Sequence, residues 1–265
     1  MSKAAMAEVA RLYYVRELTQ QEIAERLGVS RFKILRLLEQ ARSEGVVRFE
    51  IDEPIPVIDE LSRELEDRFG VTALVVERDV AGATALLLPR LLTPEDVLGV
   101  AWGETLAGVA EQLPEVGGEI PIVQICGAIE GLVPGTGPTE LAARFAAKTG
   151  GRFYPLEAPA TADETALRRV VRPTTAMFGR VSLALVGIGA RPDAAGHILV
   201  HVFDDDGRIV AAERSIALSV PQLRRTRVVA AAGGRSKRRA VLGALRTALI
   251  DVIVTDATCA RFALV

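Results

Sequence analysis

Apolar residues near the N-terminus recur with helical spacing in three successive stretches, separated by polar and charged positions. The apolar positions of each stretch, three or four residues apart, are Met6, Val9, Ala10 and Tyr13, then Ile23, Ala24 and Leu27, and then Ile34, Leu37, Leu38 and Ala41. Each set occupies one face of a helix. The first 45 residues are therefore predicted to form a small bundle of three helices.

Start and stop signals separate the second helix from the third. Thr19 followed by Glu22 makes a capping box at the start of the second helix. Gly28 suits the left-handed conformation that ends a helix, and Ser30 is placed to cap the third helix. Small Ala24 suits a close crossing of the two helices. Two helices joined by a short turn that contains glycine predict a helix-turn-helix unit.

The face of the third helix opposite its apolar side is predicted to read DNA. In this unit the N-terminal part of the second helix of the pair enters the major groove. There Arg36 could grip a guanine edge and Phe32 could touch a thymine methyl group, while neighbouring basic side chains and backbone N–H groups hold phosphates. The alternatives are a solvated charged face and, for Phe32, packing against a wing. The predicted DNA contacts are Thr19, Gln20, Ser30, Arg31, Phe32, Lys33, Arg36 and Arg42.

Beyond this segment the pattern changes twice. Residues 47–52 alternate apolar and charged side chains, which predicts a short strand suited to a wing. Pro54 and Pro56 then break the pattern. The expected organisation is a DNA-binding domain over residues 1–53, a linker at 54–56 and a second domain over 57–265.

The second domain opens with a charged amphipathic helix from Ile58 to Phe69, and then short apolar runs alternate with amphipathic stretches. The runs TALVVE, VLGVAW, IPIVQIC, RFYPL, LALVGIG, RVVAAAG and DVIVT are expected strands. Expected helices include Thr105–Leu113, Pro138–Lys148, Glu164–Met177 and Ser236–Leu249. This alternation predicts an α/β domain with a mainly parallel sheet covered on both faces. HILVHVF-DDDG-RIVAAE breaks the alternation and predicts a β-hairpin, its Asp-rich turn lacking the ligand spacing of a calcium loop.

Glycines gather where the expected strands end, at the edge where such sheets bind ligands. The Gly233–Gly234 pair is followed by a helix start at Ser236, with Lys237 in the first turn. Free N–H groups, the helix dipole and an ammonium group would meet there on an anion such as a phosphate. A plain strand-to-helix turn with a solvated lysine is the alternative. None of these turns is a Walker A loop or a complete GxGxxG motif, so no nucleotide cofactor is expected.

Composition and charge narrow the class of protein to which this chain can belong. Of the 265 residues 49% are hydrophobic and the net charge is –2, yet residues 1–50 hold nine Lys or Arg against seven acids. Two cysteines far apart in sequence, Cys126 and Cys259, predict buried thiols in a reducing cytoplasm. Two histidines leave little basis for a metal site. No apolar run has the length of a membrane span, and no signal peptide is expected.

With these motifs in view, the chain resembles the SorC family of bacterial transcriptional regulators. GVSRFKILRLLEQARSEGVVRFEI is similar to the family's DNA-binding head, and LGVAWGETL, LVGIGA, VFDDDG, AAGGRSKRRAVLGAL and DVIVTD follow the order of its effector domain. The resemblance implies a winged-helix-like head and a Rossmann-like domain related to sugar-phosphate isomerases. It also implies a phosphorylated sugar, or a free sugar or polyol, as effector. Family members are usually dimers or tetramers on palindromic operators.

Individual positions can be carried over from the resemblance. Gly103 and Thr105 match the family's WGxT loop; Gly233, Gly234 and Lys237 match its GGxxK phosphate grip; Ser30, Arg31 and Arg36 match typical groove-facing positions. Two departures stand out: His197 occupies the position of an acid that contacts sugar hydroxyls, and the segment between Gly189 and His197 is short. The expected effector contacts are Gly103, Glu104, Thr105, Gly127, Ala128, Gly189, His197, Gly233, Gly234 and Lys237.

The sequence thus favours a cytoplasmic, homodimeric or homotetrameric regulator that binds duplex operator DNA and a small anionic effector, without cofactor or membrane association. One alternative is an isomerase-like enzyme with an appended helical head, for which Glu104 and Asp206 are the only candidate bases. Another is a DNA-bound structural factor that has no ligand.

Overall fold

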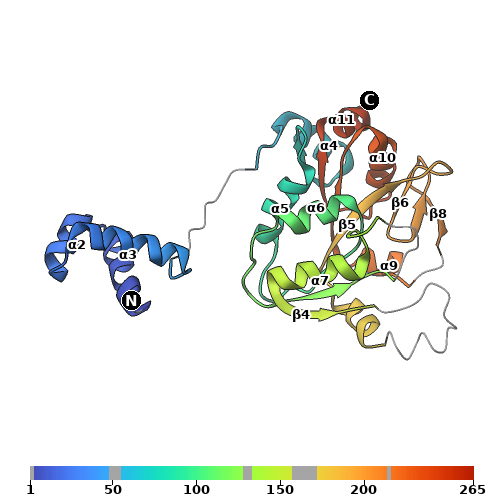
Figure 1. The fold of residues 1–265 in the computed structure, drawn as a ribbon. Coiled ribbons are helices and arrows are strands. Elements are labelled where there is room, and N and C mark those ends of the chain that lie inside the picture. Colours follow the sequence, from blue (N-terminus) through green and yellow to red (C-terminus); the bar gives the residue numbers. More distant parts are fainter. Residues whose placement is uncertain (1–2, 48–54, 128–132, 157–171, 214–215) are drawn as a thin grey trace. The chain divides into compact units, whose positions relative to one another are not determined.

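The protein consists of two compact units, Met1–Pro54 and Ile55–Val265, drawn in Figure 1. The computed structural model describes residues 3–47, 55–127, 133–156, 172–213 and 216–265. Predicted features that fall between these ranges, including most of the expected wing strand, lie outside the described residues. Of that strand only Val47 is described; it is in no strand and packs against the core of the first unit.

The first unit has the three predicted helices. They are α1 (Lys3–Ala10), which continues into a π-helical turn η1 (Arg11–Val15), then α2 (Gln20–Leu27) and α3 (Arg31–Ser43). The predicted apolar faces meet in one core, formed by Met6, Val9, Ala10, Ile23, Ala24, Ile34, Leu37, Leu38 and Ala41. Tyr13 and Leu27 are only half-buried against its edge. The helical pattern therefore placed this core correctly.

The predicted cap signals fix the turn between α2 and α3. The hydroxyl of Thr19 accepts from the backbone N–H of Glu22 at 3.2 Å, and the Glu22 carboxylate accepts from the N–H of Thr19 at 2.7 Å. Gly28 ends α2 with φ +63° and ψ +33°, the left-handed region in which a side chain would be strained. Ser30 then accepts from the N–H of Lys33 at 3.3 Å. The helix-turn-helix geometry is thus encoded in these few residues.

The second unit is built on a sheet whose seven main strands are all parallel, as the buried runs predicted. Their order across the sheet is β1 (Thr72–Val76), β10 (Val252–Asp256), β9 (Arg227–Ala232), β5 (Leu183–Ala190), β2 (Leu98–Val100), β3 (Ile120–Gln124) and β4 (Gly150–Tyr154). Neighbours pair in parallel throughout. Strands such as β9 and β10 are buried on both faces, which explains their continuous apolar sequence.

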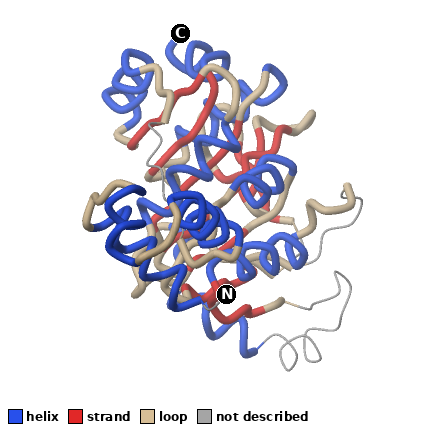
Figure 2. Tube along the Cα trace, turned by 60° about the vertical axis from the view of Figure 1, so that its left-hand side comes forward, coloured by secondary structure: helices blue, strands red, loops and turns tan. Residues whose placement is uncertain are grey.

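Helices cover the sheet on its two faces (Figures 1 and 2). Crossovers between parallel strands are right-handed. The connections from β1 through β2 and β3 to β4 run in one direction across the sheet and put their helices on one face. The connection from β9 to β10 runs in the other direction and puts α10 on the other face. The first set is α5 (Val80–Leu91), α6 (Glu104–Gln112) and α7 (Pro138–Thr149). In the second layer α4 (Asp59–Phe69) and α10 (Arg238–Arg246) both contact α11 (Ala257–Leu264). Neither α5 nor α11 was among the predicted helices.

Shorter helical segments complete the unit. The predicted helix Glu164–Met177 is described only from residue 172, where the chain is helical to Met177 and continues into a 3₁₀ turn, η2 (Phe178–Arg180). A four-residue helix, α9 (Val220–Leu223), precedes β9. Among the helices that the structure describes, none has the length and apolar character needed to span a bilayer.

The predicted hairpin after β5 is wrong in one respect, because its first half forms two strands. The strands β6 (Gly196–Ile198), β7 (His201–Phe203) and β8 (Ile209–Ala212) extend β5 as an antiparallel meander. Leu199 has φ +52°, which turns the chain between β6 and β7. The β7–β8 turn at Asp204–Gly207 is confirmed: the carboxylate of Asp204 accepts from the N–H groups of Asp206 and Arg208.

The direction in which successive strands are added across the sheet reverses between β2 and β5. From β2 the chain proceeds to β3 and β4, whereas from β5 it proceeds the other way to β9 and β10. Loops that leave the carboxyl ends of β2 and β5 therefore part from each other and open a crevice, the place where open α/β sheets bind ligands.

Candidate functional site

One face of α3 presents the predicted DNA-contacting side chains to solvent. Arg31, Phe32, Lys33, Arg36 and Arg42 are all exposed, whereas the opposite face of the helix is buried in the core. Phe32 is 83% exposed. Within the described part of the chain, this large apolar side chain is mostly exposed to water, and it is therefore available for contact with a partner.

The start of α3 is strongly cationic. Its first turn contains Arg31 and Lys33 and no acidic residue. Cations near the positive end of a helix dipole cost about 0.3–1 kcal/mol each. A nearby anion such as a DNA phosphate would offset that cost, because backbone N–H groups and side chains then meet the same charge.

Of the three remaining predicted contacts, Ser30 is exposed at the N-cap of α3, and the other two lie at the start of α2. Gln20 accepts through Oε1 from Nε of Arg31 at 3.3 Å, which links the starts of the two helices. The hydroxyl of Thr19 donates to Glu22 within the capping box, so it already has a partner. Both residues border a shallow hollow together with Tyr13, Tyr14, Glu17, Leu18, Gln21 and Arg31. Apart from the place of Tyr13 on the apolar helical face, no pattern in the sequence indicated a role for the tyrosines.

A pocket of about 50 Å³ lies in the crevice of the second unit. It is formed where β2, β5 and β9 end, and six of the predicted effector contacts line it: Gly103, Glu104, Thr105, Gly189, His197 and Lys237. Other lining residues were not predicted: Ala101, Trp102, Leu106, Gly187, Ile188 and Leu199. Residues from three distant parts of the chain, 101–106, 187–199 and 237, thus meet at the point that the sheet topology marks.

Two glycines shape the loops that enter the pocket. Gly103 has φ +123° and ψ +164°, and Gly234 has φ +100° and ψ +146°. Only glycine adopts this conformation readily. The N–H of Gly234 donates to the buried carboxylate of Asp256, which also accepts from the N–H of Cys259 at 2.8 Å. Asp256, which was not predicted, therefore holds the glycine turn in place.

Lys237 carries the positive charge of the pocket. It ends a 3₁₀ turn, η3 (Arg235–Lys237), that leads directly into α10, so the helical segment begins one residue earlier than predicted. Burial lowers the pKa of Lys237 most, while the negative charge of Glu104 raises it. A half-buried ammonium group with reduced hydration is well suited to bind an anion, because an anion would replace the lost water.

Three of the predicted effector contacts that the structure describes do not line this pocket. Gly127 is buried, and its N–H donates to the carbonyl of Ile216 at 2.7 Å. Ala128 lies outside the described residues. Gly233 and Gly234 form the turn that carries Lys237 without bordering the pocket themselves. Contact of these positions with a ligand stays a prediction.

Both cysteines are free and buried. Burial, with the neighbouring Asp256 carboxylate, raises the pKa of Cys259 to about 12, and burial alone raises that of Cys126. Thiols held in the protonated state are poor nucleophiles. Their role is therefore packing, as predicted.

A helix-turn-helix unit with basic side chains exposed on α3 and a Rossmann-like unit with a pocket lined by Lys237 together define a DNA-binding transcriptional regulator that responds to a small ligand. The comparisons with known proteins agree on both parts. Residues 4–44 match the family model "Sigma-70, region 4", a helix-turn-helix. Residues 59–194 and 190–265 match the model "Putative sugar-binding domain". These two matches overlap at 190–194, where the sequence predicted a shortened segment.

Full-length relatives show the same combination. The chain is 28% identical to the deoxyribonucleoside regulator of Bacillus subtilis, covering 96% of this chain and 95% of that protein. It is 27% identical to the sorbitol operon regulator of Klebsiella pneumoniae, covering 98% and 97%. The crystal structure of full-length SorC from Klebsiella pneumoniae superposes with a TM-score of 0.71 at 26% identity, covering 99% of both chains.

The chain belongs to the SorC family of sugar-binding transcriptional regulators. The relatives are regulators and not enzymes, so the isomerase-like alternative is set aside. The α/β architecture with a helix-turn-helix head is likewise confirmed.

Proposed function

We propose that the exposed face of α3 binds operator DNA and that the pocket around Lys237 binds the anionic group of a phosphorylated sugar. The position of the pocket supports this proposal. A half-buried lysine, and loops whose backbone conformation requires glycine, converge at the topological switch point of the sheet. A volume of about 50 Å³ admits an anionic group, since a cavity measured in this way needs only about 10–15 Å³ to hold one water molecule. The sugar then extends toward the opening.

Names of the relatives support a polyhydroxylated effector, since they refer to deoxyribonucleosides, sorbitol and erythritol.

The exposed face of α3 has side chains suited to DNA. Arg36 can pair with a guanine edge, and Arg31 and Lys33 can hold phosphates. We further propose that the protein acts in the cytoplasm as a homodimer or homotetramer. Two recognition helices of such an oligomer would meet half-sites about one DNA turn apart.

Effector control follows from linkage. Ligand binding can change operator affinity only if the ligand binds two arrangements of the oligomer with different affinity. The second unit carries the pocket and the first carries the DNA-reading face, so the ligand acts on DNA binding through the arrangement of the subunits. Repression and activation are both compatible with this scheme.

A thermal-shift screen against sugar phosphates and the corresponding free sugars tests the ligand class. A ligand present at a hundredfold excess over its Kd stabilises the protein by about 2.7 kcal/mol. We expect stabilisation by a phosphorylated sugar, its loss in Lys237→Ala, and its retention in Arg225→Ala, which removes an exposed charge outside the pocket. Equal stabilisation of wild type and Lys237→Ala would place the anion elsewhere.

A further inference from the structure

His197 is built into the wall of the pocket. It lies on β6, where it pairs with Gly189 of β5. Its imidazole stacks on the indole of Trp102, with ring centroids 5.6 Å apart and planes inclined by 22°. A Cβ on residue 189 would collide with Nε2 of the ring. The glycine and the tryptophan thus make the space that the imidazole occupies.

The hydrogen bond of the ring fixes which nitrogen faces the ligand. Nδ1 lies 3.0 Å from the carbonyl oxygen of Leu199. A carbonyl can only accept, so Nδ1 carries a hydrogen and Nε2 is the nitrogen that can gain a proton. No hydrogen bond reaches Nε2 from the described residues. Every fully buried side-chain nitrogen or oxygen among them has a partner, so Nε2 is not fully buried, and His197 lines the pocket.

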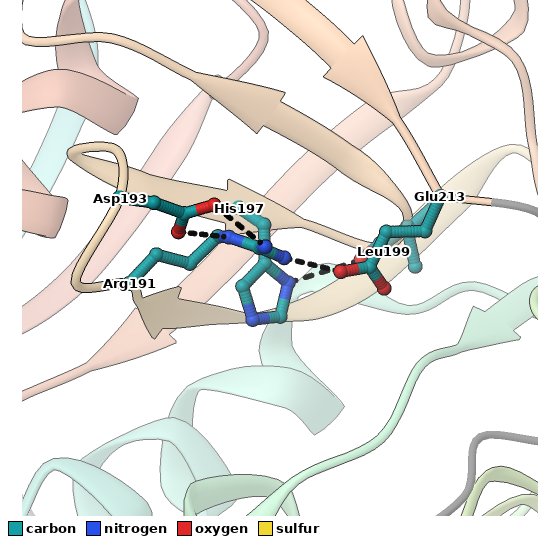
Figure 3. Close-up of polar contacts among 5 residues, drawn as sticks. All are labelled: Arg191, Asp193, His197, Leu199 and Glu213. Carbon is teal, nitrogen blue, oxygen red and sulfur yellow. Dashed lines mark hydrogen bonds and ion pairs between the residues drawn. The ribbon is translucent and has the colours of Figure 1, made fainter.

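The charged groups around the ring carry one more negative than positive charge, so a protonated His197 would balance them. On the outer side, Arg191 donates from Nε to Asp193 at 2.9 Å and also pairs with Glu213 (Figure 3). On the pocket side lie Lys237 and Glu104. The other histidine, His201 of β7, is turned to the carbonyl of Leu218. Two cations therefore face three carboxylates, and a dianion that entered this site would lack compensation.

The surroundings of the ring favour its neutral form. Burial lowers the pKa of His197 most; the hydrogen bond to Leu199 and the charge of Glu213 raise it, and Arg191 and Lys237 lower it. The cost of charging the ring is mainly lost hydration and repulsion from cations. An anion in contact with Nε2 would relieve both.

We propose that His197 is a second cationic contact of the bound anion, alongside Lys237. When a dianion enters the pocket, Nε2 takes one proton from the solvent and donates its N–H to the anion, while the Nδ1–H stays on the carbonyl of Leu199. This inference rests on the anion pocket proposed above and adds a specific chemistry to it. The ligand is one whose dianionic group is bound together with a proton.

The sign of the pH dependence follows from this chemistry. The bound ring has a higher pKa than the free ring, so binding takes up a proton between the two values. Affinity then rises as pH falls through this window, by up to about tenfold per pH unit. A neutral ring that only accepted a ligand hydroxyl would give the opposite trend, because protonation would remove the acceptor.

Sulfate is a suitable probe, since its charge stays constant between pH 5.5 and 8.5. Its binding to the full-length protein is measured calorimetrically and by thermal shift against chloride at equal ionic strength. We expect tighter binding at lower pH in wild type, a flat profile in His197→Gln, and wild-type behaviour in Arg225→Gln. Lys237→Gln should lose binding at every pH.

A second measurement does not depend on a variant that folds. The chain has two histidines, so an NMR titration resolves both rings. At pH 7 sulfate should move the Cε1–H signal of His197 toward its protonated position and leave that of His201 unchanged; the proximity of His197 to the indole of Trp102, seen as nuclear Overhauser effects in the wild type, provides the assignment.

A wild-type profile that is flat, or that weakens at low pH, overturns the role of His197 while the anion pocket stands. Absence of sulfate binding to wild type at all pH values contradicts the anion pocket itself.

Discussion

The two proposed binding surfaces differ in how their positive charges are exposed to water. On α3 the cations Arg31, Lys33 and Arg36 are exposed, so each is well hydrated and screened by salt, and binding depends on several acting together. In the second unit Lys237 is half-buried beside glycine turns. There one partly desolvated charge, in a less polar setting, is felt strongly by a single anion. The hydration of the protein's cations therefore matters as much as their number: exposed, hydrated cations suit a long polyanion, and a partly desolvated cation suits a small anion.

The cores of the two units differ in a related way. Nine buried residues form the core of the first unit, whereas the core of the second spans the whole sheet and its helices. Because the core of the first unit is small, the loss of one core side chain removes a large share of the packing that stabilises this unit. Damage to its core should therefore remove DNA binding and leave the ligand pocket intact.

Ile34→Ala is expected to have the largest effect. Ile34 is fully buried in α3, and its truncation should destabilise the first unit by about 2–5 kcal/mol. Operator binding should be lost while sulfate still stabilises the second unit. Calorimetric unfolding and fluorescence anisotropy report the two separately. Leu35→Ala, at a partly exposed position of the same helix, is the matched control; loss of sulfate binding in Ile34→Ala would contradict the independence of the units.

Arg36→Ala sharpens the comparison at the DNA face. If Arg36 pairs with a base, operator affinity should fall by about 1–3 kcal/mol and discrimination between operator and unrelated duplex should relax. Anisotropy titrations at two salt concentrations measure both. Arg63→Ala removes an exposed arginine from the second unit and should change neither. Unaltered affinity and sequence preference in Arg36→Ala would exclude the base contact.

Gly234→Ala probes the turn beside Lys237. A side chain at φ +100° and ψ +146° costs about 1–3 kcal/mol, so the second unit should melt earlier or the anion should bind more weakly. Gly117→Ala is the control, since a Cβ there meets open space at an ordinary φ. Equal melting and equal sulfate affinity for the two variants would show that the turn carries no such constraint.

Thr19→Ala should have the smallest effect. It removes the side chain that accepts from Glu22 in the capping box, which costs about 1 kcal/mol. Chemical denaturation of the first unit measures the loss. Thr19→Ser keeps the hydroxyl and should restore most of the stability; if it fails to do so, the methyl group and not the cap matters at this position.

Local signals made the first unit and the strands predictable. The pair Thr19 and Glu22, together with Gly28, acts within a few residues, so no knowledge of distant packing is needed. Helix α5 escaped because its sequence, VAGATALLLPRL, has no polar face and contains Gly82 and Pro89. Burial, not periodicity, stabilises such a helix, and burial depends on the whole fold.

The pocket was predictable to the extent that strand ends and glycines mark it. Gly103 and Lys237 were found because they follow strands directly. The stack of Trp102 on His197 could not be foreseen, because it depends on β6 folding back on β5 so that His197 faces Gly189. Asp256 was missed with α11, the helix whose start it caps.

An anion bound at Lys237 is expected to change operator affinity. The most direct test is an operator titration of wild type and Lys237→Ala, each with and without the sugar phosphate that gives the largest thermal shift. We predict that the ligand changes wild-type operator affinity by about 5–150-fold and leaves that of Lys237→Ala unchanged, with equal affinities of the two free proteins. A ligand response in Lys237→Ala equal to that of wild type would contradict the account.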